Sequence, residues 1–136
     1  MIGHNRRVTW QTARVGAARD AVAPDGSEIR LLVQVPRGSL VHCTLPPGQV
    51  TTAVRHRTVE EVWFCIAGRG EVWRRSGDAE ETVYMQRGVA LTIPLGTSFQ
   101  FRATSAEPLE VVITTMPPWP GVDEAVTVDG RWTPVR

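Results

Sequence analysis

The stretch that decides the fold is residues 48–70, G-Q-V-T-T-A-V-R-H-R-T-V-E-E-V-W-F-C-I-A-G-R-G. Its β-branched and aromatic residues favour strands, and a polar turn at residues 57–60 divides it into two such segments. The first segment ends at His56 and the second begins at Glu61. We therefore expect these two side chains to face each other across a hairpin and to share one cavity. There they hold a metal, move protons or only pair with each other.

The composition is that of an ordinary soluble globular protein. The chain has 136 residues, 42% of them hydrophobic and 21% charged, so we expect a single domain over residues 1–136. A formal net charge of +1 gives no reason to expect a nucleic-acid partner, and no apolar run is long enough to span a membrane. The basic N-terminus has no apolar segment after it, so we expect no signal peptide and a cytoplasmic location. Cys43 and Cys65 lie within strand-like runs and are expected to be buried, reduced thiols.

Proline and glycine punctuate the chain at short intervals, which is typical of many short strands joined by turns. No long helical period is present, so the pattern predicts an all-β sandwich or barrel. The barrel core is expected at about residues 28–115, after an irregular N-terminal arm at 1–27. A Pro-rich extension at 116–136 has three prolines within its first five residues, M-P-P-W-P, and we expect no regular structure there. The expected strands are 28–35, 40–45, 50–56, 61–67, 71–74, 81–86, 90–93, 98–103 and 109–115.

Two spacings in this pattern resemble the motifs of the cupins, a family of small jelly-roll β-barrels. The first cupin motif, G(x)5HxH(x)3–4E(x)6G, has the spacing of Gly48, Val54, His56, Glu61 and Gly68. The second motif, G(x)5PxG(x)2H(x)3N, has the spacing of Gly88, Pro94, Gly96, Phe99 and Ala103. The resemblance covers roughly residues 40–115 and implies a single cupin barrel, also called a double-stranded β-helix.

The resemblance also identifies which metal ligands are missing. Metal-binding cupins use the two histidines and the glutamate of the first motif and the histidine of the second. This chain keeps His56 and Glu61 but has Val54 and Phe99 at the other two positions. Two protein ligands are fewer than the three or four that a tight divalent site commonly has. We therefore expect no cofactor, and a divalent metal held by His56 and Glu61 is the alternative.

Strand alternation predicts which side chains line the barrel. Val54 and His56 share one face of their strand, and Glu61, Trp63 and Cys65 share a face of the next. The predicted pocket lining is Val54, Trp63, Cys65, Phe99, Phe101 and Trp119, with Arg55 and Gln100 as polar residues at the rim. Glu60 is expected to point outward. His42 is also expected to point outward, unless a bulge reverses the parity of its strand and brings it into the cavity.

His56 and Glu61 in an aromatic pocket are a plausible proton-transfer pair, because burial and neighbouring charges move both pKa values. Metal-independent cupin epimerases and isomerases provide a precedent by resemblance. The alternative is a structural pair in which the two buried polar groups satisfy each other by a hydrogen bond.

The predicted function is thus a small-molecule-acting cupin with metal-independent acid–base chemistry of isomerase, epimerase or lyase type, in which His56 and Glu61 are the catalytic residues. The alternatives are a non-catalytic module that binds a small ligand, and a metal-dependent oxygenase or isomerase with an incomplete site. We also expect a homodimer, because open sheet edges and faces tend to be covered by pairing. The resemblance predicts where the site lies better than which substrate it takes.

Overall fold

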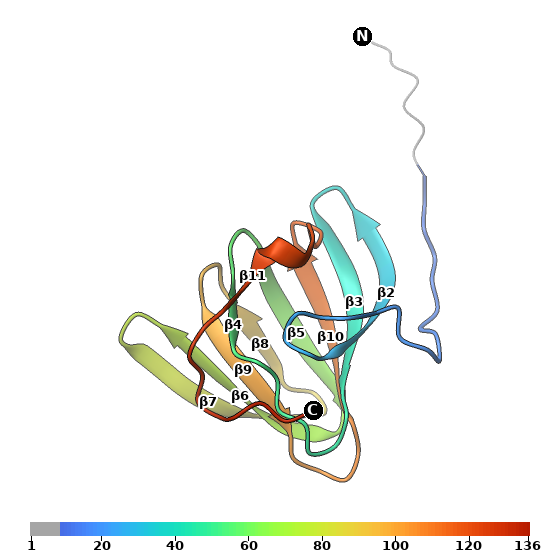
Figure 1. Cartoon of the computed structure of the whole chain (residues 1–136). Helices are drawn as coiled ribbons and strands as arrows, with labels where there is room; N and C mark the ends of the chain where they lie inside the picture. The colour runs from blue at the N-terminus through green and yellow to red at the C-terminus, as the bar shows by residue number, and fades with distance from the viewer. Residues whose placement is uncertain (1–8) are drawn as a thin grey trace.

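A computed structural model describes residues 9–136, except for the side chain of Val122. In this part of the chain two antiparallel sheets face each other and form an all-β jelly-roll barrel, which confirms the predicted fold (Figure 1). The first sheet has the strand order β1-β2-β3-β10-β5-β8 and the second has the order β11-β4-β9-β6-β7. No helix among residues 9–136 is long and apolar enough to cross a membrane.

The strands lie close to where the sequence predicts them. Nine of them, β2 to β10, correspond to predicted strands: β2, β8 and β9 have the predicted bounds, and the other six differ by a few residues at their ends. The short strands β1 and β11 are not among the predicted ones. The bounds are β1 Ala21–Val22, β2 Glu28–Val35, β3 Gly38–Leu45, β4 Val54–His56, β5 Glu60–Ala67, β6 Arg69–Ser76, β7 Ala79–Gln86, β8 Ala90–Ile93, β9 Ser98–Ala103, β10 Leu109–Met116 and β11 Ala125–Thr127.

The predicted hairpin between His56 and Glu61 is wrong. Strand β4 pairs with β9 and β11 in one sheet, whereas β5 pairs with β10 and β8 in the other. The turn at residues 57–59 therefore carries the chain from one sheet to the other. His56 and Glu61 still share a cavity, but they approach each other across the interior of the barrel.

The C-terminal extension is more regular than predicted. After the prolines, residues Val122–Glu124 form a short 3-10 helix, η1, and strand β11 then pairs with β4 along its whole length. No proline lies between Pro120 and Pro134, so residues 121–133 have the backbone N–H groups that a strand needs. The extension thus completes the edge of the second sheet beside His56.

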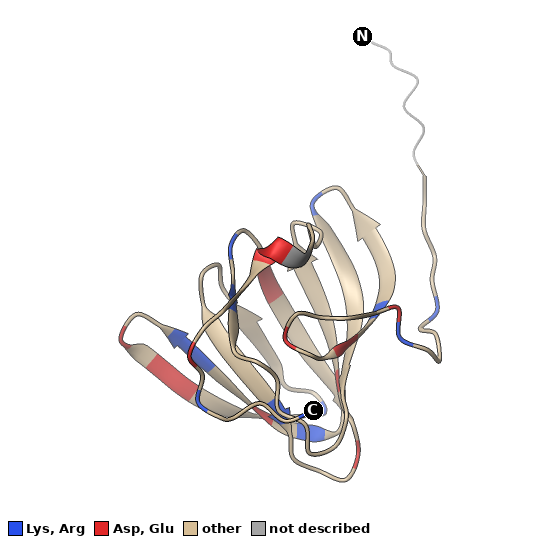
Figure 2. Ribbon diagram, in the orientation of Figure 1, with Lys and Arg blue, Asp and Glu red and all other residues tan. Residues whose placement is uncertain are grey.

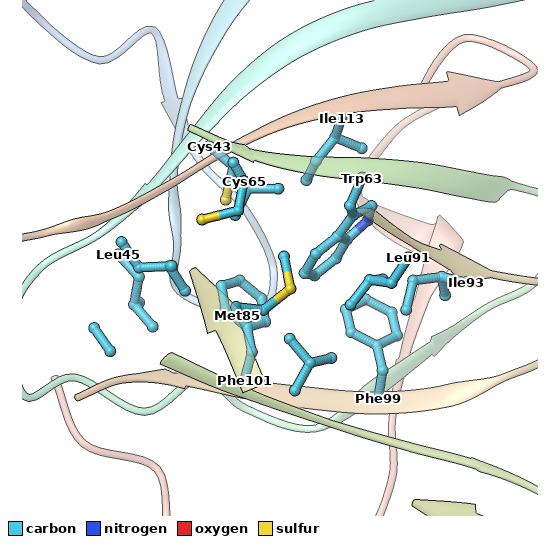
Figure 3. Close-up of a cluster of buried hydrophobic side chains, with 14 of the residues drawn as sticks. Cys43, Leu45, Trp63, Cys65, Met85, Leu91, Ile93, Phe99, Phe101 and Ile113 are labelled. Atoms are coloured by element: carbon cyan, nitrogen blue, oxygen red, sulfur yellow. The ribbon is translucent and has the colours of Figure 1, made fainter. Parts of the chain in front are cut away.

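The core lies between the two sheets and is dominated by aromatic and branched side chains. Trp63 of β5 points from the first sheet toward Phe99 and Phe101 of β9 in the second (Figure 3). Its ring lies edge-on to both, with centroid distances of 5.7 Å to Phe99 and 5.1 Å to Phe101, a geometry that favours aromatic pairs. These contacts hold the sheets together next to the cavity.

The N-terminal arm takes part in the barrel, which the sequence does not predict. Residues 9–20 have no helix or strand, as expected, and residues 1–8 lie outside the described part of the chain. Strand β1 then pairs with β2, and a turn follows in which Ala23 accepts a hydrogen bond from Gly26. This turn crosses one end of the barrel and carries Asp25 to the cavity.

Candidate functional site

A cavity of about 290 Å³ lies between the two sheets. Its walls are mostly apolar, and four of its residues are the aromatic side chains Trp63, Phe99, Phe101 and Trp119. The principal ionisable side chains in the lining are Asp25, His56 and Glu61. An apolar cavity with a few convergent polar groups is the usual form of a small-molecule site.

His56 projects into this cavity from the end of β4. The ring is 5% exposed and lies edge-on to Phe99 at 5.2 Å and to Trp119 at 5.0 Å between ring centroids. Its Nδ1 atom is buried and has no hydrogen-bond partner among the described residues. Burial lowers the pKa of His56 to about 4, although the negative charge of Glu124 opposes this shift. The imidazole is therefore neutral at physiological pH.

Glu61 faces His56 from β5 and is 6% exposed. Its Oε1 atom accepts a hydrogen bond of 2.9 Å from Nε1 of Trp63, which fixes the orientation of the carboxyl group. Burial raises the pKa of Glu61 to about 7, and the hydrogen bond from Trp63 only partly offsets the effect. Near neutral pH the cavity thus holds a carboxyl group close to its titration midpoint beside a neutral imidazole.

The two groups do not satisfy each other by a hydrogen bond. Oε2 of Glu61 lies 3.9 Å from Nδ1 of His56, which is too long for a hydrogen bond. The hydrogen-bonded structural pair considered from the sequence is therefore not what the structure contains. One carboxyl oxygen and the imidazole remain available to a molecule in the cavity.

Glu124 of η1 orders the turn between His56 and Glu61, and the sequence analysis missed it. Its carboxylate accepts hydrogen bonds from the backbone N–H groups of Thr58 at 2.6 Å and Val59 at 2.9 Å, and from the Thr58 hydroxyl at 2.5 Å. Burial favours the neutral form of Glu124, but these hydrogen bonds outweigh it and lower its pKa. No local pattern indicates this role, because the bonded residues are more than sixty positions apart.

Asp25 was also missed as a cavity residue. It is 8% exposed, and its Oδ1 atom accepts hydrogen bonds of 2.8 Å from the backbone N–H of Ser27 and 2.7 Å from the Ser27 hydroxyl. Burial raises the pKa of Asp25, and the hydrogen bonds from Ser27 offset part of this effect. The Asp-Gly-Ser sequence does predict the turn, but not that the turn closes the barrel.

The donor atoms in the cavity do not fit the divalent metal that many cupins bind. In the register of β4 and β9, Val54 lies opposite Phe99, so the two substituted ligand positions contact each other as an apolar pair. Residues 9–136 contain no group of three or more histidine, cysteine or acidic side chains arranged to hold a metal ion. His56 and Glu61 alone supply two ligands where three or four are usual.

The structure places most of the predicted pocket residues around the cavity. Val54, Trp63, Phe99, Phe101 and Trp119 line it. Cys65 does not: it is fully buried deeper in the core, because the inward face of β5 extends beyond the cavity.

The two predicted rim residues lie away from the cavity. Arg55 is exposed on the outer face of β4. Gln100 is wholly buried, because it alternates with the inward Phe99 and Phe101 and the C-terminal segment covers it. Its side chain donates hydrogen bonds to the carbonyl oxygens of Thr51 and Trp132 and accepts them from the N–H groups of Arg131 and Trp132.

His42 and Glu60 have the predicted parity. His42 lies on the face of β3 opposite to the inward residues Val41 and Cys43, and its Nε2 atom bonds Oε1 of Glu110 at 2.9 Å. It does not line the cavity. Glu60 is exposed, so Glu61 is the inward carboxylate.

The fold and the cavity define a small jelly-roll barrel with an internal site of ligand size. Residues 41–115, more than half of the chain, match the family described as "Cupin domain", and the protein belongs to that family. The resemblance drawn from the two motif spacings is confirmed. The sequence has no significant match among curated proteins.

Solved structures share this fold at low sequence identity. The capsular polysaccharide assembling protein CapF from Staphylococcus aureus aligns over 76% of this chain and 30% of its own, with 16% identity and a TM-score of 0.67. KdgF from Halomonas sp. aligns over 73% of this chain and 86% of its own, with 20% identity and a TM-score of 0.61. Oxalate decarboxylase from Bacillus subtilis aligns over 81% of this chain and 30% of its own, with 14% identity and a TM-score of 0.68. The chain thus spans less than a third of CapF and of the decarboxylase, and these likenesses show the fold alone.

Proposed function

We propose that the protein binds a small molecule in the barrel cavity and transfers protons to and from it with His56 and Glu61, without a metal. The reaction is of isomerase, epimerase or lyase type. One observation carries this proposal: a neutral imidazole and a carboxyl group near its midpoint lie 3.9 Å apart in an apolar cavity and do not hydrogen bond to each other.

The two groups suit opposite halves of a proton transfer. A buried imidazole with a pKa of about 4 carries a lone pair at neutral pH and acts as the general base that takes a proton from carbon. A carboxyl group with a pKa of about 7 keeps a proton for part of the time and acts as the general acid for the oxygen where negative charge develops. In an isomerisation the imidazolium of His56 then gives its proton to the neighbouring carbon, and the Glu61 carboxylate takes its proton back from the oxygen, which restores the starting state of both groups.

The surroundings of the pair support this chemistry. Trp63 fixes Oε1 of Glu61, which leaves Oε2 directed at His56. The edges of Phe99 and Trp119 against the imidazole hold the ring in place and exclude water from it. In such a site an electrostatic interaction is stronger than in water. The likeness to oxalate decarboxylase, at 14% identity, concerns the fold alone.

The test begins with the molecule that the protein itself selects. Native mass spectrometry of protein purified without chelator, followed by denaturation and extraction, identifies a bound small molecule. Turnover of that molecule and its close derivatives is then measured for the wild type, His56→Gln, Glu61→Gln and the surface control Arg55→Ala. We expect each cavity variant to lose roughly 10²-fold or more in kcat, as removal of a general acid or base usually does. We expect Arg55→Ala to leave kcat unchanged.

Three results would contradict the proposal. Persistent turnover in His56→Gln and Glu61→Gln with unchanged binding would exclude proton transfer by this pair. A ligand that raises the Tm but is recovered chemically unaltered would identify a binding module instead. Stoichiometric iron, manganese, nickel or zinc in elemental analysis of the untreated protein would favour the metal-dependent alternative.

A further inference from the structure

The acidic side chains that reach the cavity have no arginine beside them in its lining. Two carboxyl groups, those of Asp25 and Glu61, reach the cavity from different elements, and no arginine or lysine is among the residues that line it. Outside the barrel the two signs are mixed: on the β6–β7 hairpin Arg74 pairs with Glu81 at 2.5 Å, and Figure 2 shows acidic and basic residues side by side there. The acidic character is therefore specific to the cavity.

Among the described residues, the carboxyl group of Asp25 forms no salt bridge, although the charge of Arg136 acts on it from a distance. Its Oδ2 atom accepts no hydrogen bond from the described residues, while Oδ1 is held by Ser27. The guanidinium of Arg136 is the nearest basic group in the contacts of this turn, but it donates to the backbone oxygen of Asp25 at 2.8 Å and to the Thr52 hydroxyl at 2.9 Å. It forms no salt bridge with the Asp25 carboxylate and does not line the cavity. Burial raises the pKa of Asp25, and the charge of Arg136 opposes this shift only in part, so a ligand cation beside the free Oδ2 atom would stabilise the ionised carboxylate.

Two further features show that the cavity is built to receive a ligand. His56 is more than nine-tenths buried, and its Nδ1 atom has no partner among residues 9–136. Trp63, Phe99, Phe101 and Trp119 surround the space between the polar groups. The faces of aromatic rings attract cations, and an ammonium group between such rings and a carboxylate is stabilised by both. An anionic ligand would find no arginine or lysine in the lining to pair with.

We propose that the ligand of this cavity is an amine with an apolar body, and that Asp25 is the counter-ion of its ammonium group. The inference rests on the proposed function in one respect, that the ligand occupies this cavity. Asp25 is then the residue that determines specificity, while His56 and Glu61 act on another part of the same molecule. The site rejects carboxylates and phosphates because it offers them no basic group.

Three probes of the same shape test the inference by isothermal titration calorimetry: benzylamine, benzyl alcohol and benzoate. We expect benzylamine to bind the wild type about tenfold or more tightly than benzyl alcohol, and benzoate not to bind measurably. Asp25→Asn keeps an oxygen that can accept both hydrogen bonds from Ser27, so the turn is preserved, and its Tm verifies the fold. In this variant we expect the affinity for benzylamine to fall about tenfold and that for benzyl alcohol to change less than about twofold.

The control for the loss of one negative charge is Asp129→Asn, because Asp129 is exposed and does not line the cavity. It should bind benzylamine like the wild type. Benzoate binding as tightly as benzylamine, binding of none of the three probes, or equal effects of Asp25→Asn and Asp129→Asn would each overturn the inference. The proposed function fails separately: if the amine preference depends on Asp25 but His56→Gln and Glu61→Gln retain turnover, the inference stands and the proton-transfer mechanism does not.

Discussion

The single residues that matter most are His56 and Glu61, whose pKa values burial moves in opposite directions. For the pair to work as base and acid, His56 must be neutral and Glu61 must be protonated. With pKa values of about 4 and about 7, both conditions hold together in the mildly acidic range between them. If both groups had their ordinary pKa values, the pH dependence of activity would be different. The carboxyl group would then be ionised at every pH at which the imidazole is neutral.

We predict a bell-shaped pH dependence of kcat/KM, with limbs near the pKa values of about 4 for His56 and about 7 for Glu61. The acid limb reports protonation of the base, and the alkaline limb reports loss of the proton from the acid. Glu61→Gln should remove the alkaline limb from the residual activity. An acid limb at the ordinary pKa of histidine, with no alkaline limb that depends on Glu61, would contradict the assignment.

A second residue-scale prediction concerns stability. The pKa of Glu61 is about 7 in the folded protein and 4.5 when unperturbed, so between these values the folded state binds more protons than the unfolded state. Stability must then fall as pH rises through this window.

The free energy of unfolding of the wild type relative to Glu61→Gln should decrease by up to about 3 kcal/mol from below pH ~4.5 to above pH ~7. His56 is present in both proteins, so its opposite contribution cancels. Chemical denaturation at several pH values measures the difference in the free energy of unfolding between the two proteins. A difference that is constant or that rises with pH would refute the raised pKa of Glu61.

The sequence predicts part of this site for a clear reason. Motif spacing and strand alternation are local properties, so they place His56, Glu61, Val54 and Phe99 on inward faces. Asp25 and Glu124 depend on contacts between distant segments. No local pattern records that a turn near the N-terminus closes the barrel or that η1 caps the turn after β4.

At the scale of elements, Gln100 fixes residues 131 and 132 of the C-terminal segment to the second sheet. Its amide makes four hydrogen bonds in a wholly buried position. Gln100→Ala leaves these backbone groups without partners, and we predict a loss of roughly 2–4 kcal/mol of stability. The exposed Arg55→Ala should cost less than about 0.5 kcal/mol. Equal denaturation midpoints of the two variants would contradict this role of Gln100.

The turn between β5 and β6 needs glycine for two reasons. Gly68 has a φ of +75°, and a Cβ atom there would lie 2.1 Å from the backbone oxygen of Pro108. Gly77, in the turn between β6 and β7, also has a positive φ of +58°, but a Cβ atom there would meet open space. Gly77→Ala should therefore cost about 1 kcal/mol for the backbone conformation alone, and Gly68→Ala several times as much. Similar losses in thermal unfolding would show that no clash occurs at Gly68.

Alternation predicts which way a side chain points but not which strand lies beside its own. This is why nine strands are placed well from the sequence while the His56–Glu61 hairpin is not. Short β4 has two favourable neighbours, β9 and the late strand β11, and the hydrogen bonds of Glu124 turn the chain away from a hairpin. The regular structure after the prolines was missed because three residues of strand carry little signal without their partner.

At the scale of the whole molecule, the homodimer is still a prediction. The outward face of β5 exposes the apolar residues Val62 (43%), Phe64 (48%) and Ile66 (38%), which is the face we expect a second copy to cover. Light scattering should then give twice the chain mass of 15.0 kDa, and Phe64→Glu should give a monomer. Tyr84→Glu, which changes an exposed aromatic residue on the other sheet, is the control and should stay dimeric. A wild-type mass of one chain, or an unchanged mass for Phe64→Glu, would refute this interface.

We propose above all that this cupin cavity transfers protons with an imidazole and a carboxyl group that do not hydrogen bond to each other, in place of a metal. A high-resolution crystal structure of protein purified without chelator, with anomalous data at the absorption edges of the transition metals, tests it most directly. We predict no anomalous peak between His56 and Glu61, an Oε2–Nδ1 separation that stays beyond hydrogen-bonding distance, and density for any co-purified ligand between these groups and Asp25. An anomalous peak at about 2.1 Å from both His56 and Glu61 would contradict the claim.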